Sequence, residues 1–123
     1  TETYSDEEIR KFYSDSRITI LPIKNTKQPS GQSVTLQSMS MNTPVIISNI
    51  DGFWDKQSFI NGEHIIFVNE NTIENWEKAI VDLYTDEKKL NLLATKGMNL
   101  IQQNYNLHTF NKKVFDVLNI NNE

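Results

Sequence analysis

The residues best suited to chemistry in this sequence lie between positions 28 and 45, in a stretch of small and polar side chains. Within it, Ser30 and Gly31 form a turn that opens a predicted short helix. Glycine allows close approach of the backbone, and Ser30 and Ser33 can cap the helix or donate hydrogen bonds. A helix start directs unpaired N–H groups and a positive dipole end at one point, which favours an anion such as phosphate. An ordinary capped turn explains the same residues and stays open as the alternative.

Gln37 stands one turn further along the predicted helix. Spacings of four and three residues put it on one helical face with Ser33 and Ser40, from which its amide can reach a ligand held at the turn. Two apolar runs, residues 18–23 and Val45–Ser48, flank the stretch and are typical of buried strands. Strand, loop, helix and strand together predict a βαβ crossover.

The rest of the chain supplies further alternating elements. We expect a helix over residues 5–16 that begins with a Ser5–Glu8 capping box, a weak short helix near 56–59, and a strand over 64–68 after an Asn-Gly turn. Three helices should follow, starting at Thr72, near Asp86 and near His108, before a frayed tail over 119–123. Short apolar strands separated by helices predict an α/β fold with a parallel sheet covered on both faces.

The inward face of two of these helices can be predicted from spacing. Helix residues expected to point inward are Ile73, Trp76, Ile80 and Leu83 in the first of them, and Leu90, Leu93, Leu100 and Ile101 in the second. Glu74 and Lys78 are expected to form an i,i+4 pair. Phe110, Val114 and Leu118 give the last helix an apolar face.

Composition excludes several classes of protein. The 123 residues are one domain at most, and the chain contains no cysteine, which excludes disulfides, thiolate metal sites and cysteine nucleophiles. The net charge of -4, with scattered Lys and Arg, argues against nucleic-acid binding. No apolar run approaches the roughly 20 residues of a membrane span, and the first residues show no signal peptide. We therefore predict a cytoplasmic protein without a transmembrane segment.

Other polar and aromatic residues are candidates of lower specificity. Asp51 and Asp55 flank Gly52 after a strand, where α/β proteins place binding groups, although solvated loop acids explain them as well. Trp54 is either a lid over a ligand or a packing residue, whereas the helical spacing of Trp76 favours a core position.

Metal binding has no support in the sequence. His64 opens a strand and His108 opens a helix, and both are interpreted as structural because neither has neighbours at metal-ligand spacing. No Asp-X-Asp triplet is present. We predict no metal and no cofactor.

The ordered set of motifs resembles the C-terminal, donor-binding part of family 4 (group 1) retaining glycosyltransferases of the GT-B fold. The resemblance spans nearly the whole chain, and the ordered set is specific although each motif alone is weak. The motifs that carry it are Tyr13, Leu21-Pro22, Ser30-Gly31-Gln32-Ser33, Gln37-Ser38-Met39-Ser40, Asn42-Thr43-Pro44-Val45-Ile46, Asp51-Gly52-Phe53-Trp54-Asp55, Asn61-Gly62, Ile66-Phe67-Val68 and Tyr105-Asn106-Leu107.

The resemblance implies a Rossmann-like sheet that is the second half of a GT-B C-terminal domain, and hence a single, partial domain over residues 1–123. It also implies transfer of a hexose from a nucleotide-diphosphate sugar to a glycan or lipid-linked acceptor, with retention, as in polysaccharide biosynthesis. The donor-binding residues would be Gln28, Ser30, Gly31, Gln32, Ser33, Val34 and Gln37, with Gly52 and Asp55 as loop contacts. Catalytic residues stay unassigned. In this interpretation Gln28 takes the place of a glutamate that contacts the donor sugar, if one residue is inserted.

The chain departs from the family pattern at positions that bear on function. Gln37 replaces the glutamate that hydrogen-bonds the ribose hydroxyls, and an amide offers one acceptor and two donors where a carboxylate accepts twice. Arg17 replaces an aspartate before the strand, and Asn42 replaces a glycine. Three earlier strands of the donor domain and the acceptor domain are not in this sequence, and a full-length protein would be peripheral at the inner face of the membrane.

Two rival interpretations come from other classes. A non-catalytic sugar-nucleotide-binding or interaction module would have lost the chemistry at its glutamine substitutions. A phosphoacceptor receiver needs an aspartate at a strand end, where this chain has Ile23, Ser48 and Val68, and is disfavoured.

The predicted sheet also has an exposed edge. By resemblance its first strand, residues 18–23, lacks a neighbour, and we expect self-association through it because open strand edges template pairing.

Overall fold

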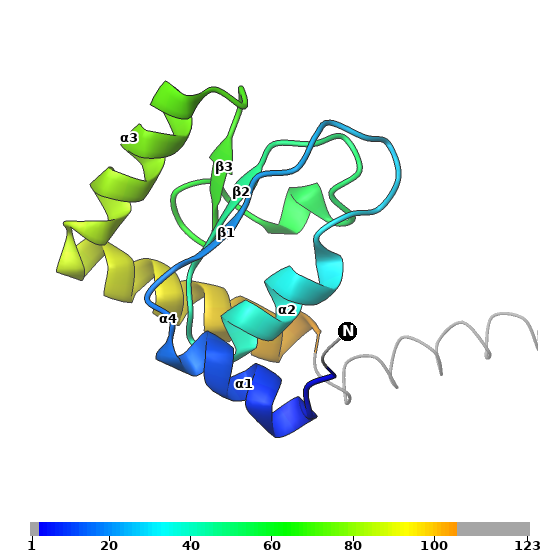
Figure 1. The fold of residues 1–123 in the computed structure, drawn as a ribbon, viewed down its shortest axis with the longest axis vertical. Helices are drawn as coiled ribbons and strands as arrows, with labels where there is room; N and C mark the ends of the chain where they lie inside the picture. Colours follow the sequence, from blue (N-terminus) through cyan, green and yellow to red (C-terminus); the bar gives the residue numbers. More distant parts are fainter. Residues whose placement is uncertain (1–2, 106–123) are drawn as a thin grey trace, which may run out of the picture.

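The computed structural model describes residues 3–105 and shows a parallel three-stranded sheet with helices on both faces (Figure 1). The elements in chain order are α1 Asp6–Asp15, β1 Thr19–Leu21, α2 Gln32–Ser40, β2 Val45–Ser48, the 3-10 helix η1 Lys56–Ser58, β3 Ile66–Val68, α3 Ile73–Tyr84 and α4 Glu87–Asn104. The strand order β1-β2-β3 confirms the Rossmann-like α/β prediction. The helix predicted from His108 and the tail lie outside the described residues. Within residues 3–105 no helix is long and apolar enough to cross a membrane.

The central strand β2 is buried on both faces, as its continuous apolar sequence predicts. Val45 and Ile47 point into one apolar cluster, and Ile46 points into another on the opposite face. The first cluster is completed by Met39, Ile50, Phe53, Phe59, Ile65, Leu100 and Ile101. The second is completed by Val68, Leu83, Leu90 and Leu93.

Helix α4 belongs to both clusters. Its first half places Leu90 and Leu93 beside α3, and its second half places Leu100 and Ile101 beside α2. Figure 1 shows α4 crossing the end of the sheet at which the strands begin. The inward residues predicted for this helix are therefore confirmed, and the opposite end of the sheet is left to the loops.

Three of the predicted helix starts, those of α1, α3 and α4, are confirmed by their caps. Ser5 and Glu8 form the capping box of α1, Thr72 accepts from the N–H of Asn75 in α3, and Asp86 accepts from the N–H of Lys89 in α4. Each side chain satisfies an N–H group that has no partner within the helix.

Two predictions for α3 are wrong. Ile73 was expected in the core but is 82% exposed, because α3 begins beyond the point at which β3 ends (Figure 1). Lys78 pairs with Asp82 at 3.2 Å instead of Glu74. Both partners stand four residues from Lys78, so spacing alone could not choose between them.

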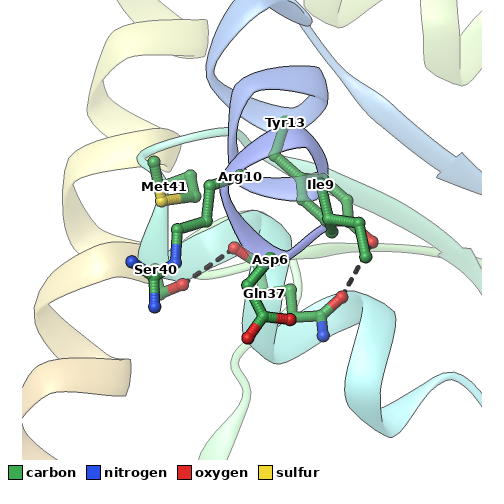
Figure 2. Close-up of a pocket in the computed structure, with 7 residues that line it drawn as sticks. All are labelled: Asp6, Ile9, Arg10, Tyr13, Gln37, Ser40 and Met41. Carbon is green, nitrogen blue, oxygen red and sulfur yellow. Dashed lines mark hydrogen bonds between the residues drawn. The ribbon is translucent and has the colours of Figure 1, made fainter. Parts of the chain in front are cut away.

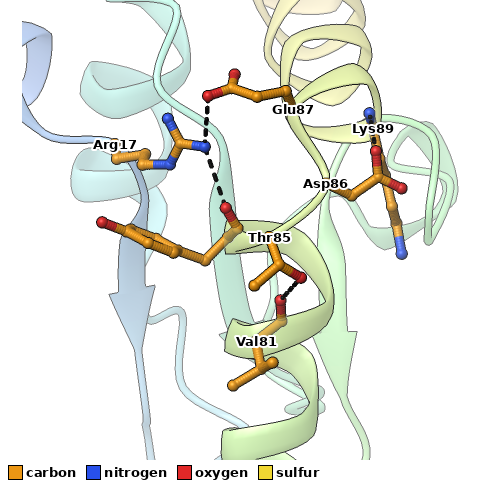
Figure 3. Close-up of polar contacts among 7 residues, drawn as sticks. Arg17, Val81, Thr85, Asp86, Glu87 and Lys89 are labelled. Carbon is orange, nitrogen blue, oxygen red and sulfur yellow. Dashed lines mark hydrogen bonds and ion pairs between the residues drawn. The ribbon is translucent and has the colours of Figure 1, made fainter.

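Arg17 fastens the start of β1 to the junction of α3 and α4 (Figure 3). Its Nη2 donates to the carbonyl of Tyr84 at 3.0 Å and to Glu87 Oε1 at 2.8 Å. The guanidinium also lies 4.8 Å from the centre of the Tyr84 ring. Arg17 thus has a structural role in this chain. The family that the chain resembles has an aspartate at this position.

Strand β1 forms one edge of the described sheet. The N–H of Thr19 donates to the carbonyl of Pro44 in the turn before β2, so by alternation the N–H and C=O of Ile18 and Ile20 face outward. Ile20 is 46% exposed. Within residues 3–105, no strand pairs with this edge.

A buried hydroxyl joins the strands where they end. Ser48, 2% exposed, accepts from the N–H of Ile23 at 2.8 Å and donates to Asn71 Oδ1 at 2.7 Å. The amide of Asn71 donates in turn to the carbonyl of Ile23 at 2.8 Å, and its oxygen also accepts from Trp76 Nε1 at 2.9 Å. Four segments of the chain therefore share one hydrogen-bond network.

We expect Ser48→Ala to lower the free energy of unfolding by about 1–3 kcal/mol, because it leaves the half-buried N–H of Ile23 without its partner. Chemical denaturation followed by circular dichroism measures this. Ser40→Ala, which removes an exposed hydroxyl from α2, serves as the matched control and should change stability by less than about 0.5 kcal/mol. Equal effects of the two changes would contradict the role of the network.

Candidate functional site

The candidate site lies at the carboxyl edge of the sheet, where the loop after β1 rests on the loop after β2. The N–H of Gly52 donates to the carbonyl of Thr26 at 2.7 Å, and the N–H of Asp51 donates to Asn25 Oδ1 at 3.0 Å. A Cβ at Gly52 would stand 2.0 Å from the carbonyl oxygen of Gln28. Gly52 is therefore buried beneath the first loop, and Asp51 is paired with Asn25 at the loop surface.

Gly31 begins α2 in a left-handed conformation with φ of 80°. A Cβ there would lie 2.8 Å from Ile47 Cδ1 and 3.4 Å from Ile23 Cδ1, so the missing side chain leaves room for the core of the sheet. Glycine is therefore required at this position by backbone conformation and packing before any ligand is considered.

Helix α2 starts without a side-chain cap. Its first internal hydrogen bond runs from the N–H of Thr35 to the carbonyl of Gly31, so the N–H groups of Gln32, Ser33 and Val34 have no partner within the helix. In α1, α3 and α4 a serine, threonine or aspartate caps the corresponding groups. The start of α2 thus keeps the donor groups and the positive dipole end that an anion requires.

The residues that the sequence predicts to bind the sugar donor lie around the start of α2. Ser30, Gly31 and Val34 are half-buried, whereas the side chains of Gln28, Gln32, Ser33 and Gln37 are exposed. Ser30 Oγ donates to the carbonyl of Gln28 at 3.3 Å and not to the helix. Along α2 the buried residues are Thr35, Ser38 and Met39. The face with Ser33, Gln37 and Ser40 is therefore the solvent face.

A cavity of about 310 Å³ lies beside Gln37, between α1 and α2 (Figure 2). Tyr13 of α1 points to Gln37 across its wall, and the Tyr13 hydroxyl donates to Gln37 Oε1 at 3.2 Å. The lining residues are Asp6, Ile9, Arg10, Tyr13, Gln37, Ser40 and Met41. Sequence reasoning missed this contact, because 24 residues separate its partners and no local pattern links them.

Asp55, the other predicted loop contact, already has a partner. It accepts a hydrogen bond from the hydroxyl of Tyr105 at the end of α4. Burial, and then this hydrogen bond to Asp55, raise the pKa of Tyr105 far above its ordinary value, so the phenol stays a donor. Asp55 therefore holds α4 against the loop after β2.

The aromatic and histidine candidates are explained by packing. Trp54 lies with its ring 4.4 Å from that of Phe53 and 5.3 Å from that of Phe59, which resolves the choice between lid and packing in favour of packing. His64 Nδ1 accepts from the N–H of Ile60 at 3.0 Å, which confirms a structural histidine. His108 lies outside the described residues.

Asn42, which stands in place of a glycine in the motif, follows α2 with a φ of 60°. Asparagine is among the residues that best tolerate the left-handed region, so this replacement preserves the turn into β2. In the part of the chain that the structure describes, no group of three or more His, Cys, Asp or Glu side chains is placed to hold a metal ion.

Comparison with known proteins identifies a family for most of the chain. Residues 1–86 match the family described as "Glycosyl transferases group 1". No curated protein matches the chain. The matched range includes β1, α2, β2, β3 and the whole of α3, and thus the whole of the candidate site.

A comparison of the two glycines with a left-handed backbone separates the energetic cost of backbone strain from the cost of packing at the start of α2. Gly31 and Gly62 have φ of 80° and 83°, but no heavy atom lies within 4 Å of a Cβ built at Gly62. We expect Gly62→Ala to cost about 1–2 kcal/mol of unfolding free energy from backbone strain alone. Gly31→Ala should cost more, because Ile47 must also move.

Thermal or chemical denaturation of both variants tests this difference. Equal losses would show that Gly31 does not pack against the sheet.

Proposed function

The chain belongs to the group 1 glycosyltransferases, and on this premise we propose that it binds the diphosphate and ribose of a nucleotide-diphosphate sugar. The reaction we propose is transfer of the hexose to a glycan or lipid-linked acceptor with retention, as in polysaccharide biosynthesis, in the cytoplasm. The single observation that carries the donor proposal is the start of α2, where three N–H groups without helical partners open at the carboxyl edge of the sheet.

The chemistry expected there is electrostatic. Glycosyl transfer from such a donor releases a nucleoside diphosphate, so negative charge on the diphosphate grows as the bond to the sugar breaks. Fixed N–H groups and a helix dipole stabilise this charge without having to reorient during the reaction. No side chain of this chain is assigned as a catalytic residue.

Gln37 is the group that we assign to the ribose. It lies on the solvent face of α2, between the helix start and the cavity lined by Tyr13 and Arg10. A nucleoside diphosphate held by its phosphates at residues 31–34 would extend along this face, with its ribose at Gln37 and its base toward the cavity. Gln28 and Gln32, both exposed, remain candidates for contacts to the sugar.

The donor proposal is tested by titrating the 123-residue chain with UDP, GDP, ADP and CDP and following the backbone amides by NMR. We expect binding by at least one of them in the millimolar range, with the largest shifts at residues 31–37. Ser33→Asp should weaken binding by about fivefold or more, because it places a negative charge at the anion site while suiting the helix start.

The matched control is Asn91→Asp, which adds the same charge on an exposed position of α4 and should leave binding unchanged. Absence of binding, or binding that Ser33→Asp does not weaken, would overturn the donor site. A non-catalytic interaction module would then become the better interpretation.

We further propose a second copy of this chain as a partner for the open edge of β1. A cavity of about 510 Å³ beside the start of β1 is lined by Tyr4, Ile9, Phe12 and Ile18, among others. Another of about 520 Å³ lies beyond its end, against Pro22 and Trp76. A strand added to this edge would gain main-chain hydrogen bonds and place alternate side chains toward these apolar cavities.

We expect Ile20→Lys to reduce self-association, because a lysine on an open edge disfavours strand pairing. Sedimentation velocity and light scattering over a range of concentrations measure this. Val81→Lys is the matched control, since Val81 is 49% exposed and Ile20 46%, but Val81 lies on α3. A monodisperse monomer at every concentration would contradict the proposal.

A further inference from the structure

The hydrogen bond between Tyr13 and Gln37 fixes which end of the Gln37 amide faces a ligand. A glutamine amide carries one oxygen that accepts and one nitrogen with two N–H donors. Because the Tyr13 hydroxyl donates to Oε1, the nitrogen must lie on the other side. Within residues 3–105, the structure shows no hydrogen bond from Gln37 Nε2 to the protein.

The backbone carbonyls of both Tyr13 and Gln37 accept hydrogen bonds from nearby groups. The carbonyl of Tyr13 accepts from Thr43 Oγ1 at 2.6 Å and from the N–H of Ser16 at 3.0 Å. The carbonyl of Gln37 accepts from Ser40 Oγ at 2.8 Å. The bond from Thr43 Oγ1 joins the end of α1 to the turn before β2, so the backbone of Tyr13 is held beside α2.

The phenol can only donate to Gln37 while it is protonated. Its partial burial raises the pKa of Tyr13 above the ordinary value of 10.0, so that it keeps its proton throughout the physiological range. The Tyr13 hydroxyl therefore keeps the proton that it donates to Gln37 Oε1, and this hydrogen bond stabilises the amide orientation with Oε1 toward Tyr13.

We propose that Tyr13 is a positioning residue that orients the Gln37 amide, so that Gln37 offers N–H donors to the ligand and the hydroxyl oxygens of the ligand accept. This proposal rests on the proposed function for the identity of the ligand, a ribose diol, but not for the orientation itself. The polarity is opposite to that of a carboxylate, which only accepts. A ribose hydroxyl can serve either arrangement, since it both donates and accepts.

The orientation is tested first without any ligand. In NMR spectra of the free chain, Gln37→Ala identifies the Nε2H2 signals of Gln37. Tyr13→Phe should shift these signals and speed their exchange with water, while the backbone amides of the sheet stay in place. Tyr84→Phe, which removes a phenol hydroxyl on an exposed residue of α3, is the matched control and should leave them unchanged. Gln37 signals that do not respond to Tyr13→Phe would overturn the proposal.

The consequence for binding is tested with the nucleoside diphosphate that binds best. If Tyr13→Phe lets the amide flip freely, about half of the molecules hold the competent orientation, and the dissociation constant rises about twofold. Gln37→Ala, which removes the side chain altogether, should raise it about fivefold.

The Gln37→Glu variant separates orientation from a general structural effect. The two oxygens of a carboxylate are equivalent, so a half-turn of the group restores the same acceptors. Tyr13→Phe should therefore change the affinity less when combined with Gln37→Glu than by itself. Equal losses in both backgrounds would overturn the positioning role. A free-state NMR effect without any nucleotide binding would leave the orientation standing and remove the proposed donor site.

Discussion

The hydrogen bond between Ser48 and Asn71 is the contact on which the organisation of the site depends. Ser48 ends an otherwise apolar, buried strand, and its hydroxyl is satisfied from two sides, by the N–H of Ile23 and the amide of Asn71. Because an unpaired buried hydroxyl is costly, this network fixes the relative positions of the segments that leave the sheet. The loop carrying the candidate site leaves β1 at this network.

The contact between the loop after β1 and Gly52 positions the start of α2. The loop after β1 lies on Gly52, at a separation that any side chain there would prevent, and Gly31 then turns the chain against Ile47. The proposed anion site therefore consists of backbone groups whose directions are set by packing. This agrees with an electrostatic role, since preorganised dipoles stabilise charge better than flexible side chains do.

Helix α1 contributes to the site although none of its residues is fully buried. It is attached through Tyr13, whose hydroxyl donates to Gln37 in α2 and whose carbonyl accepts from Thr43 in the turn that follows α2. Arg17 then ties the following residues to the junction of α3 and α4. The helix thus acts as a wall of the cavity beside Gln37 rather than as part of the core.

The sequence by itself determined the elements and their order, because caps, apolar runs and turns are local signals read within a few residues. It thereby indicated the α/β sheet and the buried β2, and the family motifs indicated a group 1 glycosyltransferase. Tertiary structure alone decided the choices between equivalent local partners, such as Asp82 over Glu74 for Lys78, and the exposure of Ile73. It also decided the contacts of Ser48 with Asn71 and Tyr13 with Gln37, since pairings across more than 20 residues depend on how the helices pack against the sheet.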